Sequence, residues 1–358
     1  MSRESGWIGR LLRGWVRRRG VGVFALVLGG LTLAGCRNGA SAGASAPPDS
    51  LLRRVADVPL PGPAVRFDYQ SVDTARHRLY VAHMNAGTLL VYDLRGDSVV
   101  ADLPGFSSVH GVIAVPELEK VYATATGDHQ LVAVDAGTLR VLARTGPIGY
   151  PDGLAYAPTS GRVFVSDESS QGQELVVDAR SDQAVDRIEL GGEAGNTVYE
   201  PGSGHVLVAV QTRQQVVEID ASTDRIVARH DLPESDRPHG LLVDARDRLL
   251  FVGDEGNDRL LLVDLDSWKI VGRWPVGRGP DVLAYDPGLG LLYVACESGV
   301  VSVFRRRGRT LESEGALRTP HAHTVSVDPT THRVYLPLED IEGKPVLRIM
   351  VPRTAPPS

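Results

Sequence analysis

Short apolar stretches recur along the chain at a nearly constant interval. The first is Leu79–Ala82, and six similar stretches begin at residues 121, 163, 206, 250, 292 and 334. Successive stretches are therefore 42 to 44 residues apart, a period typical of propeller blades and solenoid repeats. We conclude that the chain contains seven copies of one structural unit.

Each copy has the pattern of four short strands separated by polar turns. In the fifth copy these are His239–Val243, Arg248–Gly253, Leu260–Val263 and Lys269–Arg273, with His239–Val243 as the innermost strand. The runs are short and β-rich, turn residues separate them, and no helical period is present. This pattern excludes an alternation of helices and strands.

The third strand of most copies ends in an aspartate: Asp93, Asp135, Asp178, Asp220 and Asp264. A carboxylate at such a position accepts hydrogen bonds from the backbone of the following turn. We therefore interpret these aspartates as structural and not catalytic. The sixth copy has Phe304–Arg307 at this point, for which we expect a longer and more basic turn.

The seventh copy lacks a fourth strand, and the missing strand lies at the other end of the chain. Arg54–Pro59 closely matches Val99–Pro104, the fourth strand of the first copy. An N-terminal strand that completes the last blade would close the ring without open sheet edges. The sequence thus predicts an all-β, seven-bladed β-propeller of four-stranded blades over residues 51–353, followed by a tail at 354–358.

Two motifs in the third copy indicate a family. Pro151–Tyr156, followed by Gly161–Val165, resembles the YVTN-type, YncE-like seven-bladed β-propellers, and the resemblance extends over about residues 51–353. It implies the propeller fold. Members include secreted binding proteins, and neighbouring propeller families include lactonases and lyases, so the resemblance implies no single activity.

The N-terminus has the pattern of an export signal. Residues 1–20 carry six arginines and one acid, and the apolar run Val21–Ala34 is too short to span a bilayer comfortably. Leu33–Cys36 resembles the bacterial lipobox, which implies a signal peptide at 1–35 and lipidation of Cys36. Alternatives are an ordinary secretory signal with an incidental cysteine and, from Arg17–Arg19, twin-arginine export.

Residues 36–50 are expected to form a flexible tether because Gly, Ala, Ser and Pro cannot bury enough apolar surface to fold. The predicted location is the bacterial cell envelope. Residue 37 is Arg and not the Asp that retains lipoproteins at the inner membrane, so the outer membrane or its periplasmic face is preferred.

Charge and cysteine content limit the partners. Without residues 1–35 the chain has 32 basic and 43 acidic residues, and this net charge of −11 repels phosphate backbones. We expect a monomer that contacts the membrane through its lipid, with a small ligand or envelope protein as partner and no nucleic acid, although Arg305–Arg307 leaves a local basic patch open. Cys296, the second of two cysteines, is interpreted as a buried structural residue.

Seven polar residues precede the apolar stretches at a common offset. The offset is eleven residues, except for ten in the fourth copy, and the residues are Asp68, His110, Asp152, Asn196, His239, Asp281 and His323. In a closed propeller, equivalent positions point to one axial opening, so these side chains should converge in a ring. Neighbouring carboxylates would favour imidazolium or orient the histidines toward a metal. The alternative is a polar, solvated channel whose groups satisfy one another and water.

The loops after the second strands should open on the same face, and they are acidic. Their acids are Asp128, Asp167, Glu168, Asp254, Glu255, Glu297, Glu339 and Asp340, while His83 and Gln211 occupy the remaining two loops. A face lined with carboxylates favours cations or cationic ligands. A plain solvated rim is the alternative interpretation.

Three classes of function are consistent with these patterns. The first is a binding propeller that takes a small ligand, cation or protein partner at the axial mouth. The second is a metal-dependent hydrolase or lyase, and the third is a cell-envelope scaffold. No phosphate-binding glycine loop, paired-cysteine motif or nucleophile elbow is present, so no catalytic residue is identified.

The most specific expectation concerns a metal. It is a divalent cation, or a ligand bound through one, held in the ring with His110, His239 and His323 as first candidates and Asp68, Asp152 and Asp281 as ligands or orienting groups. A wide channel would instead favour a hydrated cation or an organic ligand.

Overall fold

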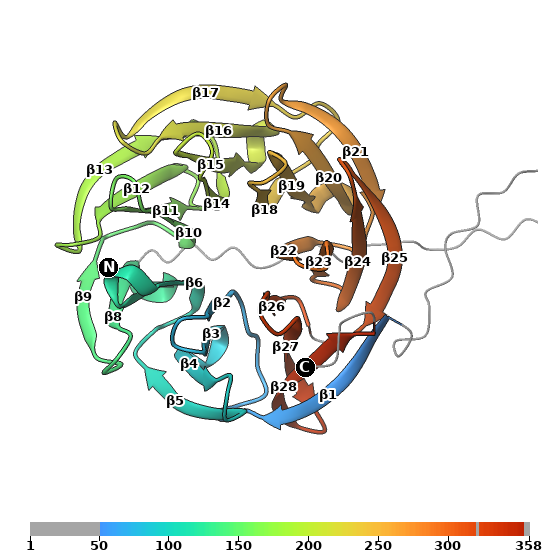
Figure 1. The fold of residues 1–358 in the computed structure, drawn as a ribbon. Helices are drawn as coiled ribbons and strands as arrows, with labels where there is room; N and C mark the ends of the chain where they lie inside the picture. Colours follow the sequence, from blue (N-terminus) through green and yellow to red (C-terminus); the bar gives the residue numbers. More distant parts are fainter. Residues whose placement is uncertain (1–50, 320–321, 354–358) are drawn as a thin grey trace, which may run out of the picture. The chain divides into compact units, whose positions relative to one another are not determined.

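Seven four-stranded antiparallel sheets stand around a common centre in the computed structural model, which describes residues 51–319 and 322–353 (Figure 1). The predicted signal peptide, tether, Cys36 lipidation and C-terminal tail lie outside the described residues. Within the described ranges, no helix has the length and hydropathy that crossing a bilayer requires.

In six of the seven blades the strands follow the chain from the centre outward, and in the seventh the outermost strand comes from the N-terminal end of the described chain. The innermost strands are β2 (Gln70–Asp73), β6 (Val109–Val115), β10 (Pro151–Ala157), β14 (Ala194–Glu200), β18 (Pro238–Asp244), β22 (Pro280–Asp286) and β26 (Ser326–Asp328). The second strands are β3 (Arg78–His83), β7 (Lys120–Ala125), β11 (Arg162–Asp167), β15 (His205–Val210), β19 (Leu249–Asp254), β23 (Leu291–Cys296) and β27 (Arg333–Ile341).

The third strands are β4 (Thr88–Asp93), β8 (Gln130–Asp135), β12 (Gln173–Asp178), β16 (Gln215–Asp220), β20 (Arg259–Asp264), β24 (Val300–Arg307) and β28 (Lys344–Pro352). The outermost strands are β5 (Ser98–Pro104), β9 (Val141–Thr145), β13 (Gln183–Glu189), β17 (Arg225–Asp231), β21 (Lys269–Pro275), β25 (Thr310–Arg318) and β1 (Leu52–Pro59). Short 3-10 helices occupy Met84–Ala86, Pro116–Leu118, Thr126–Asp128, Gln211–Arg213 and Glu255–Asn257. We number the blades 1 to 7 from β2 to β26.

The repeated apolar stretch lies on the second strand of every blade and is buried there, which is why it is the most regular part of the sequence. Apolar side chains of neighbouring blades share each core. Phe164 and Val176 of blade 3, for example, pack with Val206 and Val208 of blade 4. A blade therefore buries its faces only against its neighbours, as in other repeat proteins.

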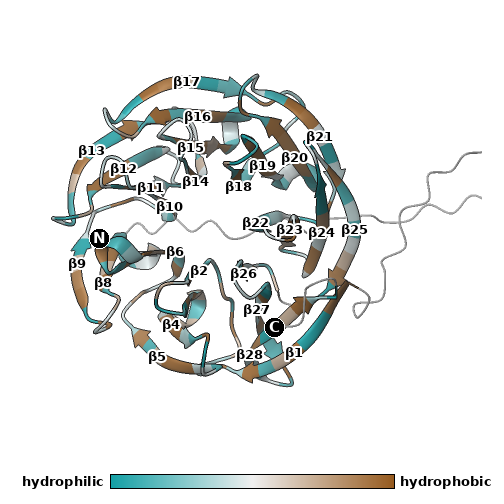
Figure 2. Cartoon of the chain, viewed as in Figure 1, coloured by the Kyte–Doolittle hydropathy of each residue, from teal (hydrophilic) through white to brown (hydrophobic). Residues whose placement is uncertain are grey.

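The outermost strands have one face toward the protein and one toward solvent. Figure 2 shows this as alternating brown and teal along β13, β17 and β21. Each outermost strand also contains a one-residue bulge, which in β17 lies between Ile226 and Ala228. The extra residue is Val55, Val100, Leu142, Val185, Val227 or Val271 in six blades and Glu314 in blade 6. The six apolar ones are exposed.

The N-terminal strand closes the ring as predicted. β1 pairs antiparallel with β28, with Leu52 opposite Pro352 and Pro59 opposite Val346. Arg348 donates from Nε and Nη2 to the two carboxylate oxygens of Asp57, at 2.8 and 2.7 Å. The predicted fold, a seven-bladed propeller whose last blade contains β1, is confirmed.

The aspartates at the ends of the third strands have the predicted structural role. Asp264, for example, accepts hydrogen bonds from the backbone N–H groups of Asp266 and Ser267. Backbone donors contact the other four in the same way.

The expectation of a longer turn in the sixth copy is wrong. β24 and β25 extend until Arg307 pairs with Thr310, so only two residues connect them. The basic residues there are paired: Arg305 contacts Glu314, Arg307 lies 3.1 Å from Glu312, and Arg306 lies 3.4 Å from Asp244 of blade 5. Acids of the same chain thus neutralise the basic stretch.

Candidate functional site

Five of the seven predicted ring residues line one pocket of about 160 Å³ at the axial opening: Asp68, His110, Asp152, His239 and Asp281. Each lies two residues before the position where the regular pairing of its innermost strand with the second strand begins. The blades approach each other closely here. A Cβ on Gly240, the residue after His239, would lie only 1.9 Å from the carbonyl oxygen of Asp281. Only glycine permits this approach of β18 to β22.

The fourth blade differs because Asn196 is not at the equivalent position. Thr197 pairs with Val208, so the residue two before it is Gly195. Asn196 lies one residue further on and lines a separate cavity of about 360 Å³ between the innermost strands. Its Oδ1 accepts a hydrogen bond from the N–H of Thr197. The offset of ten residues instead of eleven was the signal of this difference.

His323 is at the equivalent position of blade 7 but is not among the residues that line the axial pocket. Its Nδ1 lies 3.7 Å from Glu339, and its Nε2 is buried without a hydrogen-bond partner among the described residues. Burial and the nearby Arg66 guanidinium lower the pKa of His323, so the imidazole is neutral.

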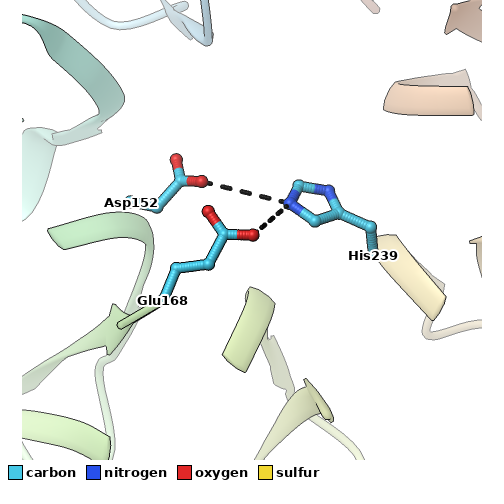
Figure 3. Close-up of side chains that lie close together, drawn as sticks. All are labelled: Asp152, Glu168 and His239. Carbon is cyan, nitrogen blue, oxygen red and sulfur yellow. Dashed lines mark ion pairs between the residues drawn. The ribbon is translucent and has the colours of Figure 1, made fainter. Parts of the chain in front are cut away.

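His239 lies between carboxylates of three other strands or loops. Its Nε2 is 3.3 Å from Glu168 Oε1 and 4.0 Å from Asp152 Oδ2, and its Nδ1 is 3.3 Å from Asp281 Oδ1. Figure 3 shows Asp152 and Glu168 approaching the same ring nitrogen. Blade 3 supplies both of these carboxylates and blade 5 supplies the histidine, so the contact passes over blade 4, where Gly195 has no side chain.

The electrostatics of the pocket follow from burial among many acids. Burial and the neighbouring carboxylates Asp281 and Glu168 raise the pKa values of Asp68 and Asp152 well above their ordinary range. Burial acts to lower the pKa of His239, but Asp281 and Glu168 outweigh it and raise that pKa. The site therefore holds a positive charge on His239 and protons on some of its acids.

Arg66 is the principal cation opposite these acids. It donates from Nη2 and Nη1 to Glu297 at 2.7 and 3.2 Å, and the same Nη2 lies 3.8 Å from Asp68 and 3.9 Å from Asp281. A second guanidinium, that of Arg237, donates to Gln211 Oε1 at 2.9 Å. Both guanidiniums also line the pocket.

His110 is held in one tautomer by the partners of its two ring nitrogens. Its Nδ1–H donates to the Ser108 carbonyl at 2.7 Å, which leaves Nε2 to accept the hydroxyl of Tyr150 at 3.1 Å. Burial lowers the pKa of His110, so this imidazole is neutral. Burial and Asp152 raise the pKa of Tyr150 to about 12, so its hydroxyl keeps the proton that it donates.

Several buried polar atoms of the pocket lack a partner within the described chain: Asp68 Oδ1, Asp152 Oδ1, the Tyr69 hydroxyl and Arg66 Nε. Asp68 and Asp152 are 2% and 5% exposed. Buried polar atoms are almost always hydrogen-bonded in proteins. These atoms therefore mark a place that water or a ligand occupies.

Five of the eight acids predicted at the loops after the second strands fall into two groups. Asp167 accepts hydrogen bonds from the N–H groups of Gly149 and Tyr150, and Asp254 accepts one from Asp236. These two acids fix the loops that precede the innermost strands. The next residues, Glu168 and Glu255, line the pocket, together with Glu297 from the equivalent position of blade 6.

Two other loop residues have different roles. Gln211 donates from Nε2 to Glu168 and to the Ala194 carbonyl, so it holds Glu168 beside His239. His83 is fully buried and stacks on Phe67 with ring centroids 4.1 Å apart. It belongs to the packing and not to the pocket.

Four pocket residues were missed in the sequence: Arg66, Tyr69, Tyr150 and Arg237. Three of them, Arg66, Tyr150 and Arg237, precede a ring residue by two positions, in blades 1, 3 and 5. This shared offset was a usable signal, but only blades 1 and 5 have arginine there and the other blades have other residue types. Cys296 is fully buried on β23, and burial raises its pKa, which agrees with a structural residue.

Among the described residues, one group has the geometry of a metal site: Asp152, Glu168 and His239, whose ligand atoms all lie within 4.8 Å of one another. His239 and Asp152 belong to the metal hypothesis from the sequence, whereas His110 and His323 are not in this group. Glu168 was predicted only as one of the loop acids.

Comparison with known proteins supports the fold. No protein-family model matches the chain, and no curated protein matches it in sequence. Among solved structures it is similar to a chain of hydrazine synthase from Kuenenia stuttgartiensis, with a TM-score of 0.69 and 14% identity. The match covers 81% of this chain and 96% of that chain. At this identity the likeness concerns the propeller architecture alone.

Proposed function

We propose that this chain is an exported, membrane-tethered propeller of the YVTN-type, YncE-like family that binds a small cation or a small positively charged molecule in its axial pocket. One observation carries the proposal: buried carboxylate oxygens of Asp68 and Asp152 lie at the pocket without a hydrogen-bond partner in the described chain. A cation would supply what these oxygens lack.

The charge and size of the pocket support the same class of ligand. Six carboxyl groups line it, and with protons on Asp68 and Asp152 the remaining four carboxylates still outnumber the two guanidiniums and the imidazolium of His239. Such an excess of negative charge in a recess attracts cations. The pocket volume of about 160 Å³ corresponds to roughly five water molecules, so the ligand is an ion or a molecule of a few heavy atoms.

Thermal unfolding of the full chain tests this function. We expect Mn²⁺, Zn²⁺, methylammonium or putrescine to raise the Tm at millimolar concentration, and sodium acetate to have no such effect. Glu255→Gln removes one carboxylate from the pocket and should weaken the binding of any cation about 3- to 10-fold. If none of these cations stabilises the protein, the proposed function is wrong.

A metal-dependent hydrolase or lyase is the second candidate, and the cluster of Asp152, Glu168 and His239 favours it. A metal held by three side chains keeps coordination positions open for water or substrate. The test is hydrolysis of a panel of simple lactones and esters by the metal-loaded full chain. A hydrolase of this kind should lose its activity in Glu168→Gln, while a binding protein should show none at the outset.

The tether is a separate part of the proposal. We infer that the chain is lipidated at Cys36 and attached to the cell envelope, with the outer membrane preferred. Fractionation of cells that produce Cys36→Ser is the check. Membrane association that persists in this variant would contradict lipid anchoring.

A further inference from the structure

We propose that Asp152, Glu168 and His239 form a specific binding site for one divalent metal ion of the Zn²⁺ or Mn²⁺ type. This inference rests on the proposed binding of cations in the axial pocket and identifies where and how the cation is held. It assigns the ion to one side of the pocket, between blades 3 and 5, and not to the centre of a ring of three histidines.

The separations between the ligand atoms suit a metal. Nε2 of His239 lies 3.3 Å from Glu168 Oε1 and 4.0 Å from Asp152 Oδ2. Two ligands of a tetrahedral ion with bonds of about 2.0–2.1 Å are roughly 3.4 Å apart. The Glu168 oxygen is thus already at this separation from Nε2, the Asp152 oxygen would have to move closer to Nε2, and all three ligand atoms lie within 4.8 Å of one another.

The orphaned atom of Asp152 is a second, independent indication of a ligand. Asp152 is 5% exposed, and its Oδ1 has no hydrogen-bond partner among the described residues although the side chain lines the pocket. A buried carboxylate with an unsatisfied oxygen is costly unless a bound group contacts it. A metal would satisfy it.

Asp281 lies beside the second ring nitrogen of His239. Its Oδ1 is 3.3 Å from Nδ1 and has no hydrogen-bond partner among the described residues, so it is free to accept the Nδ1–H while Nε2 is near Glu168 and Asp152. Histidines that bind metals usually donate their second N–H to a carboxylate or carbonyl in this way. Gln211 similarly holds Glu168 through its Nε2 amide.

The donor set limits the kind of metal. One neutral imidazole and two carboxylates suit Zn²⁺ and Mn²⁺, whereas Ca²⁺ takes six to eight oxygen ligands. A bound ion would therefore displace the protons that His239 and Asp152 carry in its absence. The three side chains come from two blades that are not adjacent, so a bound ion would link blades 3 and 5 across Gly195. Tyr150 and Arg66 line the same pocket.

Calorimetric titration of the full chain with ZnSO₄, MnCl₂ and CaCl₂ tests the site. We expect one Zn²⁺ or Mn²⁺ per chain and much weaker binding of Ca²⁺. Glu168→Gln should reduce the affinity at least about 100-fold, and Asp281→Asn about 10- to 100-fold. The matched control is Glu189→Gln, which removes an exposed carboxylate at the outer edge of the same blade and should leave the affinity unchanged.

Visible absorption of bound Co²⁺ separates an orienting role of Asp281 from a merely structural one. We expect the Co²⁺ spectrum to change in Asp281→Asn because the imidazole is no longer held toward the ion. Thermal unfolding of each variant shows that it is folded. A Co²⁺ spectrum identical to wild type would overturn the orienting role.

Failure of this inference can be told from failure of the proposed function. If Glu168→Gln weakens metal binding no more than Glu255→Gln does, the charge of the pocket holds the ion without specific coordination. If organic cations stabilise the protein and metals do not, the pocket binds cations but has no metal site. In both cases the three-residue site is wrong and the cation pocket stands; if no cation of either kind binds, both are wrong.

Discussion

Gly195 determines how the side chains of blades 3 and 5 can meet. It occupies the position of blade 4 that carries Asp or His in the other blades, and it leaves that position without a side chain. A Cβ built on it would lie 3.2 Å from the Cα and 3.3 Å from Cδ2 of His239, and 3.3 Å from Cγ of Gln211. The glycine thus provides the space in which His239 reaches Glu168.

Gly195→Ala should therefore weaken cation binding more than it weakens the fold. The new methyl group would push His239 and Gln211 by a few tenths of an ångström, and we expect about a tenfold loss of Mn²⁺ affinity. The free energy of unfolding should change by less than about 1 kcal/mol. Calorimetric titration and urea unfolding measure the two effects.

Gly137→Ala is the matched control, because Gly137 lies in the turn after β8, with only the Asp135 carboxylate near its Cβ position. It should leave Mn²⁺ affinity unchanged. Wild-type affinity in Gly195→Ala would show that the space beside His239 is not required.

At the residue scale, the sequence predicted which positions converge but not which atoms meet. Five residues at the offset of eleven, Asp68, His110, Asp152, His239 and Asp281, line one pocket, whereas His323 has the same offset and does not line it. The pairing of His239 with Glu168 depends on a missing side chain in blade 4 and on side-chain conformations, neither of which a repeat pattern contains. The repeat pattern did not predict Arg66 either, because an arginine stands two residues before the ring position only in blades 1 and 5.

At the scale of elements, the outermost strands share a bulge that the sequence did not reveal. Ile226 and Val227 are both apolar, so the hydrophobic pattern alone does not tell which of the two is extra. The ladder shows that Val227 is unpaired between Ile226 and Ala228 and is exposed. A bulge bends and twists an edge strand, which hinders edge-to-edge pairing with another molecule.

Deletion of Val227 tests the role of the bulge. Side chains alternate along a strand, so the deletion would move Arg225 and Ile226 each to the other face of the sheet. Ile226 would then lose its contacts with the core of blades 3 and 4. We expect a loss of about 1–3 kcal/mol in the free energy of unfolding. Val227→Ala keeps the bulge and should cost less than about 0.5 kcal/mol. Equal stability of both variants in urea unfolding would show that the register tolerates the slip.

At the scale of the whole molecule, the ring is closed by pairing between its two ends. The sequence predicted this closure because Arg54–Pro59 matches the fourth strand of blade 1. This similarity identified the strand that closes the ring, but it did not predict the ion pair between Asp57 and Arg348. Asp102, which is equivalent to Asp57 in that match, has no ion pair with a described residue, whereas Asp57 contacts Arg348 on β28 and lies 3.0 Å from Arg54.

Asp57→Asn should weaken the closure in a way that depends on pH. Hydrogen bonding to Arg348 outweighs burial and lowers the pKa of Asp57 below its ordinary value of 3.8. The stabilisation from the ionised pair is therefore fully present above that ordinary value and is lost as the pH falls through the lowered pKa of the folded protein. Both side chains are about one-fifth exposed, so after solvent screening we expect the substitution to lower the free energy of unfolding by only about 0.5–1 kcal/mol at pH 7.

Urea unfolding should show this gap in stability between wild type and Asp57→Asn from pH 8 to pH 5, with a decrease toward zero in stronger acid and a smaller gap in high salt. Asp102→Asn, at the matching position of a blade that does not close the ring, should show no such gap. If Asp57→Asn behaves like Asp102→Asn at every pH, the backbone pairing of β1 with β28 holds the ring closed without help from this ion pair.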